Sequence, residues 1–174
     1  MTTQSRKIEA GNQKIHKIVD ITLDSHSLVM RSADLEIERH KAISDLLHEN
    51  SFRLKEPDNA QGPYRLMLSL EDERLILHIA CTKTGHQENL RILLAPMKQH
   101  ISDYAIVCDN FYKTARAGQI HRLEAIDAGR RSIHDEAAGL LAENLENKVI
   151  LDKMTARRLF SLLYVLHMRN APNI

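Results

Sequence analysis

Tryptophan is absent from this sequence of 174 residues, and phenylalanine and tyrosine together supply only 4% of it. Proteins that bind single-stranded nucleic acid usually stack bases on aromatic side chains, so this scarcity argues against such a surface. An excess of charge of one sign is also missing, because basic and acidic side chains nearly cancel to a formal +1 at pH 7. There is no bulk electrostatic reason to expect nucleic acid or an anionic membrane as a partner.

Long apolar runs and cysteine clusters are missing too. The most apolar stretch, residues 159–168, is about half of the roughly 20 residues that a membrane span needs. Residues 1–14 are polar and lack the apolar segment of a signal peptide. The two cysteines, Cys81 and Cys108, lie inside apolar patterns, which is typical of buried thiols in a reducing compartment. We therefore expect a soluble cytoplasmic protein without a membrane span, a metal ion or another cofactor.

The most informative stretch runs from Gln119 to Asn147 and is expected to form the longest helix. Arg130 occupies the position at which its apolar stripe should continue, and Asp127 and His134 lie one turn before and one turn after it. The apolar residues of this stripe recur at steps of three and four, and they are Leu123, Ile126, Ile133, Ala137, Leu140 and Leu141.

This cluster has a functional and a structural interpretation. A guanidinium near a core cannot lose its proton, so Arg130 needs a carboxylate, carbonyls or an anionic ligand. In the functional interpretation Arg130 and Arg131 clamp an anion, His134 acts as an acid or base, and Asp127 and Glu136 flank them. In the structural interpretation Arg130 pairs with a carboxylate of another element. We favour the structural interpretation, because paired structural arginines are commoner than anion clamps.

Other candidate sites are less specific. Cys108 lies in the middle of an apolar stripe, where burial should raise the pKa of its thiol and disfavour a nucleophile. The ten histidines show no HxH or HxxxH spacing, so we interpret them as scattered surface residues. Gly62-Pro63 is a loop without the further glycines and lysine of a phosphate-binding motif. Arg157-Arg158 would make either a second anion contact or a solvated turn, and we favour the turn.

The order of the expected elements favours an α+β fold. Strands and helices are segregated along the chain, so we expect an antiparallel β-meander with about four α-helices packed mainly on one face. A single domain should cover 15–169, between a disordered tail at 1–14 and a frayed tail at 170–174. The expected strands are 17–24, 52–54, 64–70, 74–81 and 90–94, with an extended link at 149–151, and the expected helices are 32–49, 98–117, 119–147 and 153–169.

Short motifs spread over residues 18–168 carry a resemblance to a known family. They are Ile21-Thr22-Leu23-Asp24, His48-Glu49-Asn50-Ser51-Phe52, Gly62-Pro63-Tyr64-Arg65-Leu66, Leu68-Ser69-Leu70, Asp103-Tyr104, Glu124-Ala125-Ile126-Asp127, Gly129-Arg130-Arg131, His134, Glu136, Thr155-Ala156-Arg157-Arg158-Leu159-Phe160 and Val165-Leu166-His167. On these residues the chain resembles the uncharacterised protein family 0262 (UPF 0262), found mainly in alphaproteobacteria. The resemblance implies a small bacterial cytoplasmic protein, and it carries no activity to these positions.

Two functional hypotheses follow. The first is an interaction or regulatory protein without catalysis, whose surplus apolar surface would serve a homodimer or a protein partner. It rests on the lack of a specific nucleophile, metal or phosphate motif. The second is an enzyme or ligand-binding protein for a small anionic substrate, using Arg130, Arg131, His134 and Glu136. Nucleic-acid binding is a weaker third hypothesis, since it would rest on two arginine pairs alone.

Overall fold

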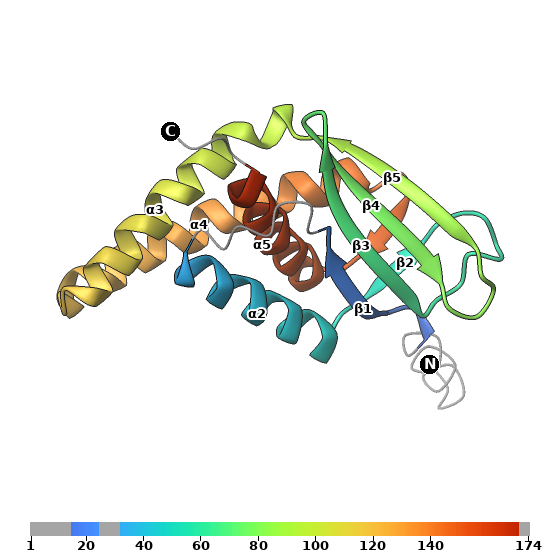
Figure 1. Cartoon of the computed structure of the whole chain (residues 1–174), viewed down its shortest axis with the longest axis horizontal. Coiled ribbons are helices and arrows are strands. Elements are labelled where there is room, and N and C mark those ends of the chain that lie inside the picture. Colours follow the sequence, from blue (N-terminus) through green and yellow to red (C-terminus); the bar gives the residue numbers. More distant parts are fainter. Residues whose placement is uncertain (1–14, 25–31, 171–174) are drawn as a thin grey trace, which may run out of the picture.

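The computed structural model describes residues 15–24 and 32–170, so the tail predicted at 1–14, and the tail predicted at 170–174 apart from Asn170, lie outside the described residues. The helices and strands are arranged as Figure 1 shows. In chain order they are β1 (Ile18–Leu23), α2 (Ala33–His48), β2 (Phe52–Leu54), β3 (Tyr64–Glu71), β4 (Arg74–Cys81), β5 (Gln87–Leu93), the 3-10 turn η1 (Ala95–Met97), α3 (Lys98–Arg116), α4 (Ile120–Leu145), β6 (Val149–Leu151) and α5 (Lys153–Asn170). The fold class predicted from the sequence, α+β, is confirmed.

The main sheet has four strands in the order β1-β3-β4-β5. Strands β3, β4 and β5 form the antiparallel meander that the sequence predicts, with Leu68 opposite Leu77 and Leu77 opposite Leu90. Strand β1, however, pairs with β3 in parallel, so the sheet is mixed and the prediction of a purely antiparallel sheet was wrong. Parallel neighbours need a long crossover connection, and the segment containing α2 supplies it between β1 and β3.

A second, small sheet corrects another expectation. The segment from Val149 to Leu151 is strand β6 rather than an unpaired link, and it pairs antiparallel with β2 so that Phe52 lies opposite Leu151. Two segments this short carry too little sequence pattern to reveal a pairing across almost 100 positions of the chain. Together they join the start of α5 to the segment after α2.

Strand β1 departs from a simple alternation of buried and exposed side chains. In a regular strand Val19 would point inward with Ile21, but it is 40% exposed while Ile18 and Ile21 are buried. The register between β1 and β3 shifts between Ile18 and Asp20. A bulge of this kind adds a residue to one strand, so the side chains after it point to the opposite faces of the sheet. A strict alternation of apolar and polar residues in a sequence does not predict it.

Helix boundaries follow local capping chemistry. The Ser32 hydroxyl accepts a hydrogen bond from the backbone N–H of Leu35 at 3.2 Å and so caps α2. Asp152 caps α5 by accepting from the N–H of Thr155 at 2.6 Å. Gly118 separates α3 from α4 with a φ of +67°, a conformation that glycine adopts without strain.

Helix α5 is the central element of the helical layer. Its residues from Leu159 to Leu166 are all buried, as expected for a helix that is apolar on nearly every side. It packs against α2 on one side and α4 on the other, and α3 pairs with α4. Figure 1 shows the α3–α4 hairpin reaching past the other helices, at the end of the molecule away from the main sheet. None of the helices in the described part of the chain is long and apolar enough to cross a membrane.

Candidate functional site

The buried face of α4 differs from the apolar stripe read from the sequence. His134, expected at the edge of the stripe, is 7% exposed, whereas Ile133 and Arg130 are only partly buried. The first half of α4 packs mainly against α3, because the α3–α4 hairpin extends past α2 and α5 (Figure 1). The second half of α4 packs against α5. The fully buried residues of α4 are His134, Ala137, Ala138, Leu141 and Leu145.

The guanidinium of Arg130 is held by neighbouring side chains of the protein. Its Nε and Nη2 donate to Oδ1 of Asp127 at 3.0 and 2.7 Å, and its Nη1 donates to the hydroxyl of Tyr104 at 3.3 Å. Glu38 from α2 lies 3.9 Å from Nη1, and the guanidinium carbon stands 4.9 Å from the centre of the Phe111 ring. Burial alone would lower the pKa of Arg130, but its hydrogen bonds and electrostatic interactions with Asp127 and Tyr104 raise it. Arg130 therefore stays protonated, and Asp127 and Tyr104 fix its position.

His134 is enclosed by aromatic rings and stays neutral. Its ring lies 5.1 Å from that of Tyr104 and 5.2 Å from that of Phe160, and Nε2 is 2.8 Å from Oγ of Ser161 on α5. Burial, followed by the charges of Arg157 and Arg130, lowers the pKa of His134 to about 3. An imidazole with this pKa carries no positive charge near pH 7, so His134 is poorly matched to acid–base work there.

The remaining predicted site residues divide into two groups. Asp127 accepts from Arg130 and also pairs with Arg131, whose Nε lies 3.3 Å from Oδ2, so one carboxylate serves two arginines. The Arg131 side chain is 60% exposed. Glu136 is not brought to this cluster, because it points elsewhere and contacts Ser132 at 3.3 Å and His100 at 3.8 Å.

Helix α5 brings two further arginines to the same place. Arg157 pairs with Asp135, and Nη1 of Arg158 donates to the backbone carbonyl of Glu49. The expectation that this pair forms a solvated turn was wrong, since both side chains are partly buried and face the cluster on α4. Burial, with the charges of Arg130 and Arg131 adding to it, lowers the pKa of Arg157.

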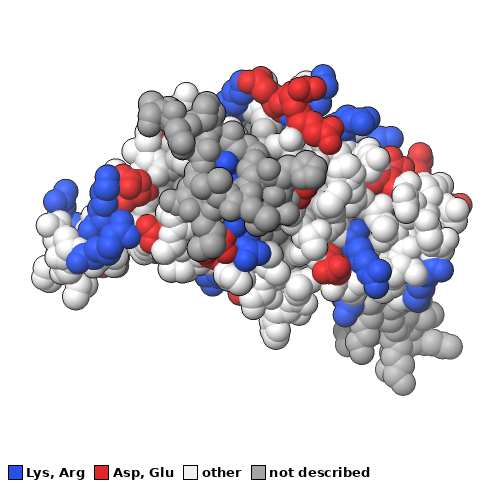
Figure 2. All heavy atoms as spheres, in the orientation of Figure 1, with Lys and Arg blue, Asp and Glu red and all other residues white. Residues whose placement is uncertain are grey.

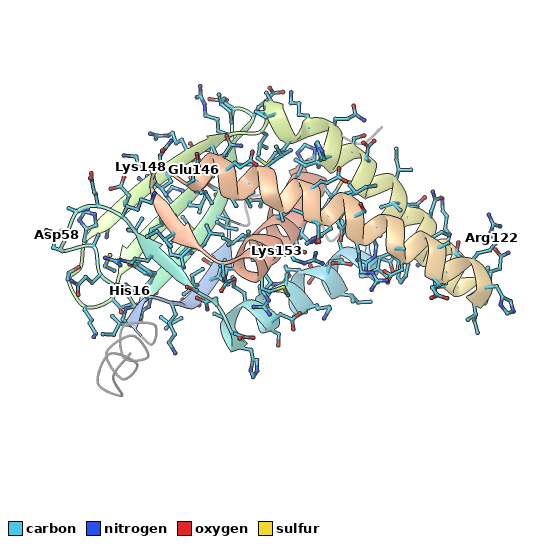
Figure 3. The ribbon with its side chains drawn as sticks, turned by 180° about the vertical axis from the view of Figure 1, so that it is seen from behind. His16, Asp58, Arg122, Glu146, Lys148 and Lys153 are labelled. Carbon is cyan, nitrogen blue, oxygen red and sulfur yellow. The ribbon has the colours of Figure 1, made fainter. Side chains whose placement is uncertain are left out.

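These side chains surround a cavity of about 230 Å³, which we call the cationic cavity. Figure 3 views the side on which α4 and α2 lie on either side of the start of α5, marked there by Lys153. Residues of four helices, α2, α3, α4 and α5, line the cationic cavity. Its lining residues are Glu38, Lys41, Ala42, Asp45, Tyr104, Arg130, Arg131, His134, Met154, Arg157, Arg158 and Ser161. The cavity therefore unites two arginine pairs that lie 27 positions apart in the sequence.

Lys41 and the Arg157–Arg158 pair are the parts of this site that sequence reasoning missed or undervalued. Lys41 lies on α2 and pairs with Asp45 at 3.0 Å, an ordinary helix-surface spacing of four residues. The pattern of α2 gives no sign that this pair borders a cavity. The adjacent Arg157 and Arg158 at the start of α5 were a usable signal of the site. Most of α5 is buried, so both side chains could not be expected to point into solvent.

The residues in 15–24 and 32–170 contain no group of three or more His, Cys, Asp or Glu side chains placed to hold a metal ion. Burial raises the pKa of the Cys108 thiol to about 11, and burial also raises the pKa of Cys81. Both thiols are therefore protonated near neutral pH, which agrees with their prediction as buried core residues.

A second polar chain lies on the outer face of the main sheet. Oγ of Ser69 is 3.0 Å from Nε2 of His78, and Nδ1 of His78 is 3.0 Å from Oδ1 of Asn89. The order hydroxyl, imidazole, amide resembles a nucleophile with its base. Ser69 is only 3% exposed, however, and it lies in the middle of a paired strand, so its hydroxyl is not open to a substrate. We interpret this chain as structural.

Comparison with known proteins agrees with the motif resemblance. The model of the Uncharacterised protein family (UPF0262) matches residues 15–169. Three curated proteins, each named only UPF0262 protein, illustrate the similarity. That of Sphingopyxis alaskensis is 40% identical over 91% of this chain and 98% of its own length. Those of Erythrobacter litoralis and Caulobacter vibrioides are 42% and 44% identical over 88% of this chain, and over 98% and 94% of their own lengths. No solved structure matches this chain.

Proposed function

The chain belongs to the Uncharacterised protein family (UPF0262), and we propose that it is a binding protein for a small anionic ligand rather than a catalyst. The observation that carries the proposal is the cationic cavity, in which lysine and arginine side chains of three helices surround one space. Guanidinium groups are preferred for carboxylate and phosphate recognition, because their planar set of donors matches the oxygens of such anions.

The donors available to a ligand are not those of Arg130. Asp127 and Tyr104 already accept from three of its nitrogen atoms. Arg131 gives only its Nε to Asp127 and is largely exposed, and Arg158 gives Nη1 to a neutral carbonyl rather than to a carboxylate. In this proposal Arg130 and Asp127 form the frame of the site, and Arg131 and Arg158 bind the anion, with Lys41 across the cavity.

Binding without catalysis suits the protonation states around the cavity. A general acid or base works best with a pKa near the working pH, whereas the pKa of His134 is about 3. Burial raises the pKa of the Cys108 thiol, which lies one helical turn after Tyr104 on α3. This thiol would therefore be a weak nucleophile. A ligand held here would bind and alter the stability or surface of the protein, which is how a regulatory protein works. We keep the cytoplasm as its proposed compartment, because both thiols are buried and unpaired.

A protein partner or a second copy of the chain is the second candidate. The specific observation is the projecting α3–α4 hairpin, where Ile106 and Ile120 are large apolar residues with 60% and 75% exposure. Lys and Arg side chains gather over the free end of this hairpin in Figure 2. Light scattering over a range of concentrations tests a homodimer: a mass that stays at 19.9 kDa would argue against self-association.

Thermal unfolding with small anions at constant ionic strength tests the binding proposal. A ligand at about 100 times its Kd adds about 2.7 kcal/mol to the free energy of unfolding. For a chain of this length that raises Tm by about 5–10 °C. The rise should be lost in Arg131→Gln and kept in Arg122→Gln, which removes an arginine of the same helix at the far end of the hairpin (Figure 3). Equal shifts in both variants would contradict binding in the cationic cavity.

A further inference from the structure

The charges in and around the cationic cavity do not balance. Five cationic side chains and two carboxylates line it, and two further carboxylates pair with its lining arginines. The cations are Lys41, Arg130, Arg131, Arg157 and Arg158, the lining carboxylates are Glu38 and Asp45, and the pairing carboxylates are Asp127 and Asp135. Positive charge therefore exceeds negative charge by one in this set, and by three among the lining residues alone, and a bound anion would compensate the excess.

The cations with donors left for a ligand come from different directions, although Lys41 also pairs with Asp45 and Arg131 with Asp127. Lys41 stands on α2, Arg131 on α4 and Arg158 on α5, and all three line the same space. A flat carboxylate is satisfied by a single guanidinium on one side. A tetrahedral anion, whose oxygens point several ways, can accept from three helices at once. The geometry of the donors therefore favours a phosphoryl-type group.

One lining residue has an unpaired polar atom. Nδ1 of His134 has no hydrogen-bond partner within the described part of the chain, although its ring is 7% exposed and lines the cavity. If the Ser161 hydroxyl donates to Nε2, then Nδ1 carries the hydrogen and is a donor without an acceptor. Buried polar atoms without partners are uncommon, and a bound water or ion is one way in which such an atom is satisfied.

We propose that the cationic cavity binds a doubly charged phosphoryl group carried by a small molecule, with Arg131, Arg158 and Lys41 as its ligating side chains. This inference rests on the ligand-binding function proposed above and names the chemical class of the ligand. The size is suitable, since about 230 Å³ holds a phosphoryl group with a short organic part but not a nucleotide-sized or polymeric ligand.

Calorimetric titration of the full chain with four probes tests the charge and the shape of the ligand. The probes are glycerol 2-phosphate, sulfate, acetate and succinate, each at about pH 5 and pH 7.5. A phosphate monoester loses its second charge with a pKa of about 6, so its affinity should fall about tenfold at the lower pH. Sulfate stays doubly charged over this range, and it reports any titration of Glu38, Asp45, Asp127 or Asp135. The sulfate affinity should therefore change by less than about twofold. His134 stays neutral throughout, because its pKa is about 3.

The outcomes separate this inference from the proposed function. Binding of the phosphate ester and sulfate at least about tenfold more tightly than acetate and succinate, lost in Arg131→Gln and kept in Arg122→Gln, supports the inference. Acetate or succinate binding as tightly as the phosphate ester, and lost in Arg131→Gln, would overturn the phosphoryl inference while the binding function stands. No binding of any of the four probes would overturn both.

Discussion

Asp127 binds Arg130 through one oxygen, Oδ1, which accepts from both Nε and Nη2, and this leaves Oδ2 to pair with Arg131. The carboxylate thus stands in the position that an external anion would compete for. It holds Arg130 in place, and it also reduces the positive charge that the cationic cavity presents to a ligand. Stability and ligand affinity should therefore respond in opposite directions when this carboxylate is removed.

Asp127→Asn should lower the free energy of unfolding by about 1–3 kcal/mol, because the partly buried Arg130 loses its charged acceptor. The same change should raise the affinity for a phosphate ester, because two arginines lose a competing anion. Urea unfolding and calorimetric titration measure the two effects. Asp109→Asn removes a carboxylate that pairs with exposed Lys113 and serves as the control, with little expected change in either quantity. A fall in both stability and affinity would contradict the role assigned to Asp127.

Ser161 holds the imidazole of His134 across the boundary between α5 and α4. Ser161→Ala should destabilise the protein by about 1–3 kcal/mol, since Nε2 of a buried ring would lose its partner. Ser132→Ala is the matched control, because Ser132 donates at the surface to Glu136 from the same helix as His134. Denaturant unfolding that shows equal, small effects for both variants would mean that the buried hydrogen bond does not form.

The low pKa of His134 makes stability depend on pH. The unfolded chain binds a proton at this residue below the ordinary pKa of 6.5, whereas the folded chain does so only near pH 3. Stability contributed by His134 is therefore present above pH 6.5 and is lost as the pH falls towards about 3, on the order of 1.4 kcal/mol per pH unit.

Urea unfolding of wild type and His134→Gln at several pH values between about 4 and 7.5 isolates this contribution. The wild type should be the more stable at neutral pH, and the difference should shrink as the pH falls. His16 and His167, whose pKa values burial also lowers, are present in both proteins and cancel in the comparison. A difference that is constant with pH would show that His134 titrates normally in the folded state.

Much of the fold could be predicted because local signals agreed with one another. The expected helix starts at 32 and 153 and the expected helix end at 117 agree with the structure to within one residue, because Ser32, Asp152 and Gly118 are residue types that cap or end helices. The parallel pairing of β1 and the β2–β6 pair could not be predicted, because they depend on contacts between distant segments. The bulge near Val19 likewise depends on its partner strand.

The candidate site was only half visible in the sequence. Arg130, Arg131 and His134 stood out because charge interrupted an apolar period on one helix. Arg157, Arg158 and Lys41 did not, since their meeting with α4 is a product of helix packing. Glu136 was included on helix spacing alone, and in the folded chain it points to Ser132 and His100 instead.

The most direct test of the central claim is to follow the arginine Nε–Hε signals by NMR while a phosphate ester is added. Signals are assigned with Arg131→Gln, Arg158→Gln and Arg122→Gln. We predict that the signals of Arg131 and Arg158 shift together and saturate, while that of Arg122, at the far end of the α3–α4 hairpin, stays in place (Figure 3). Unchanged signals for Arg131 and Arg158 at saturating ester, or equal shifts of all three, would contradict an anion-binding role for the cationic cavity.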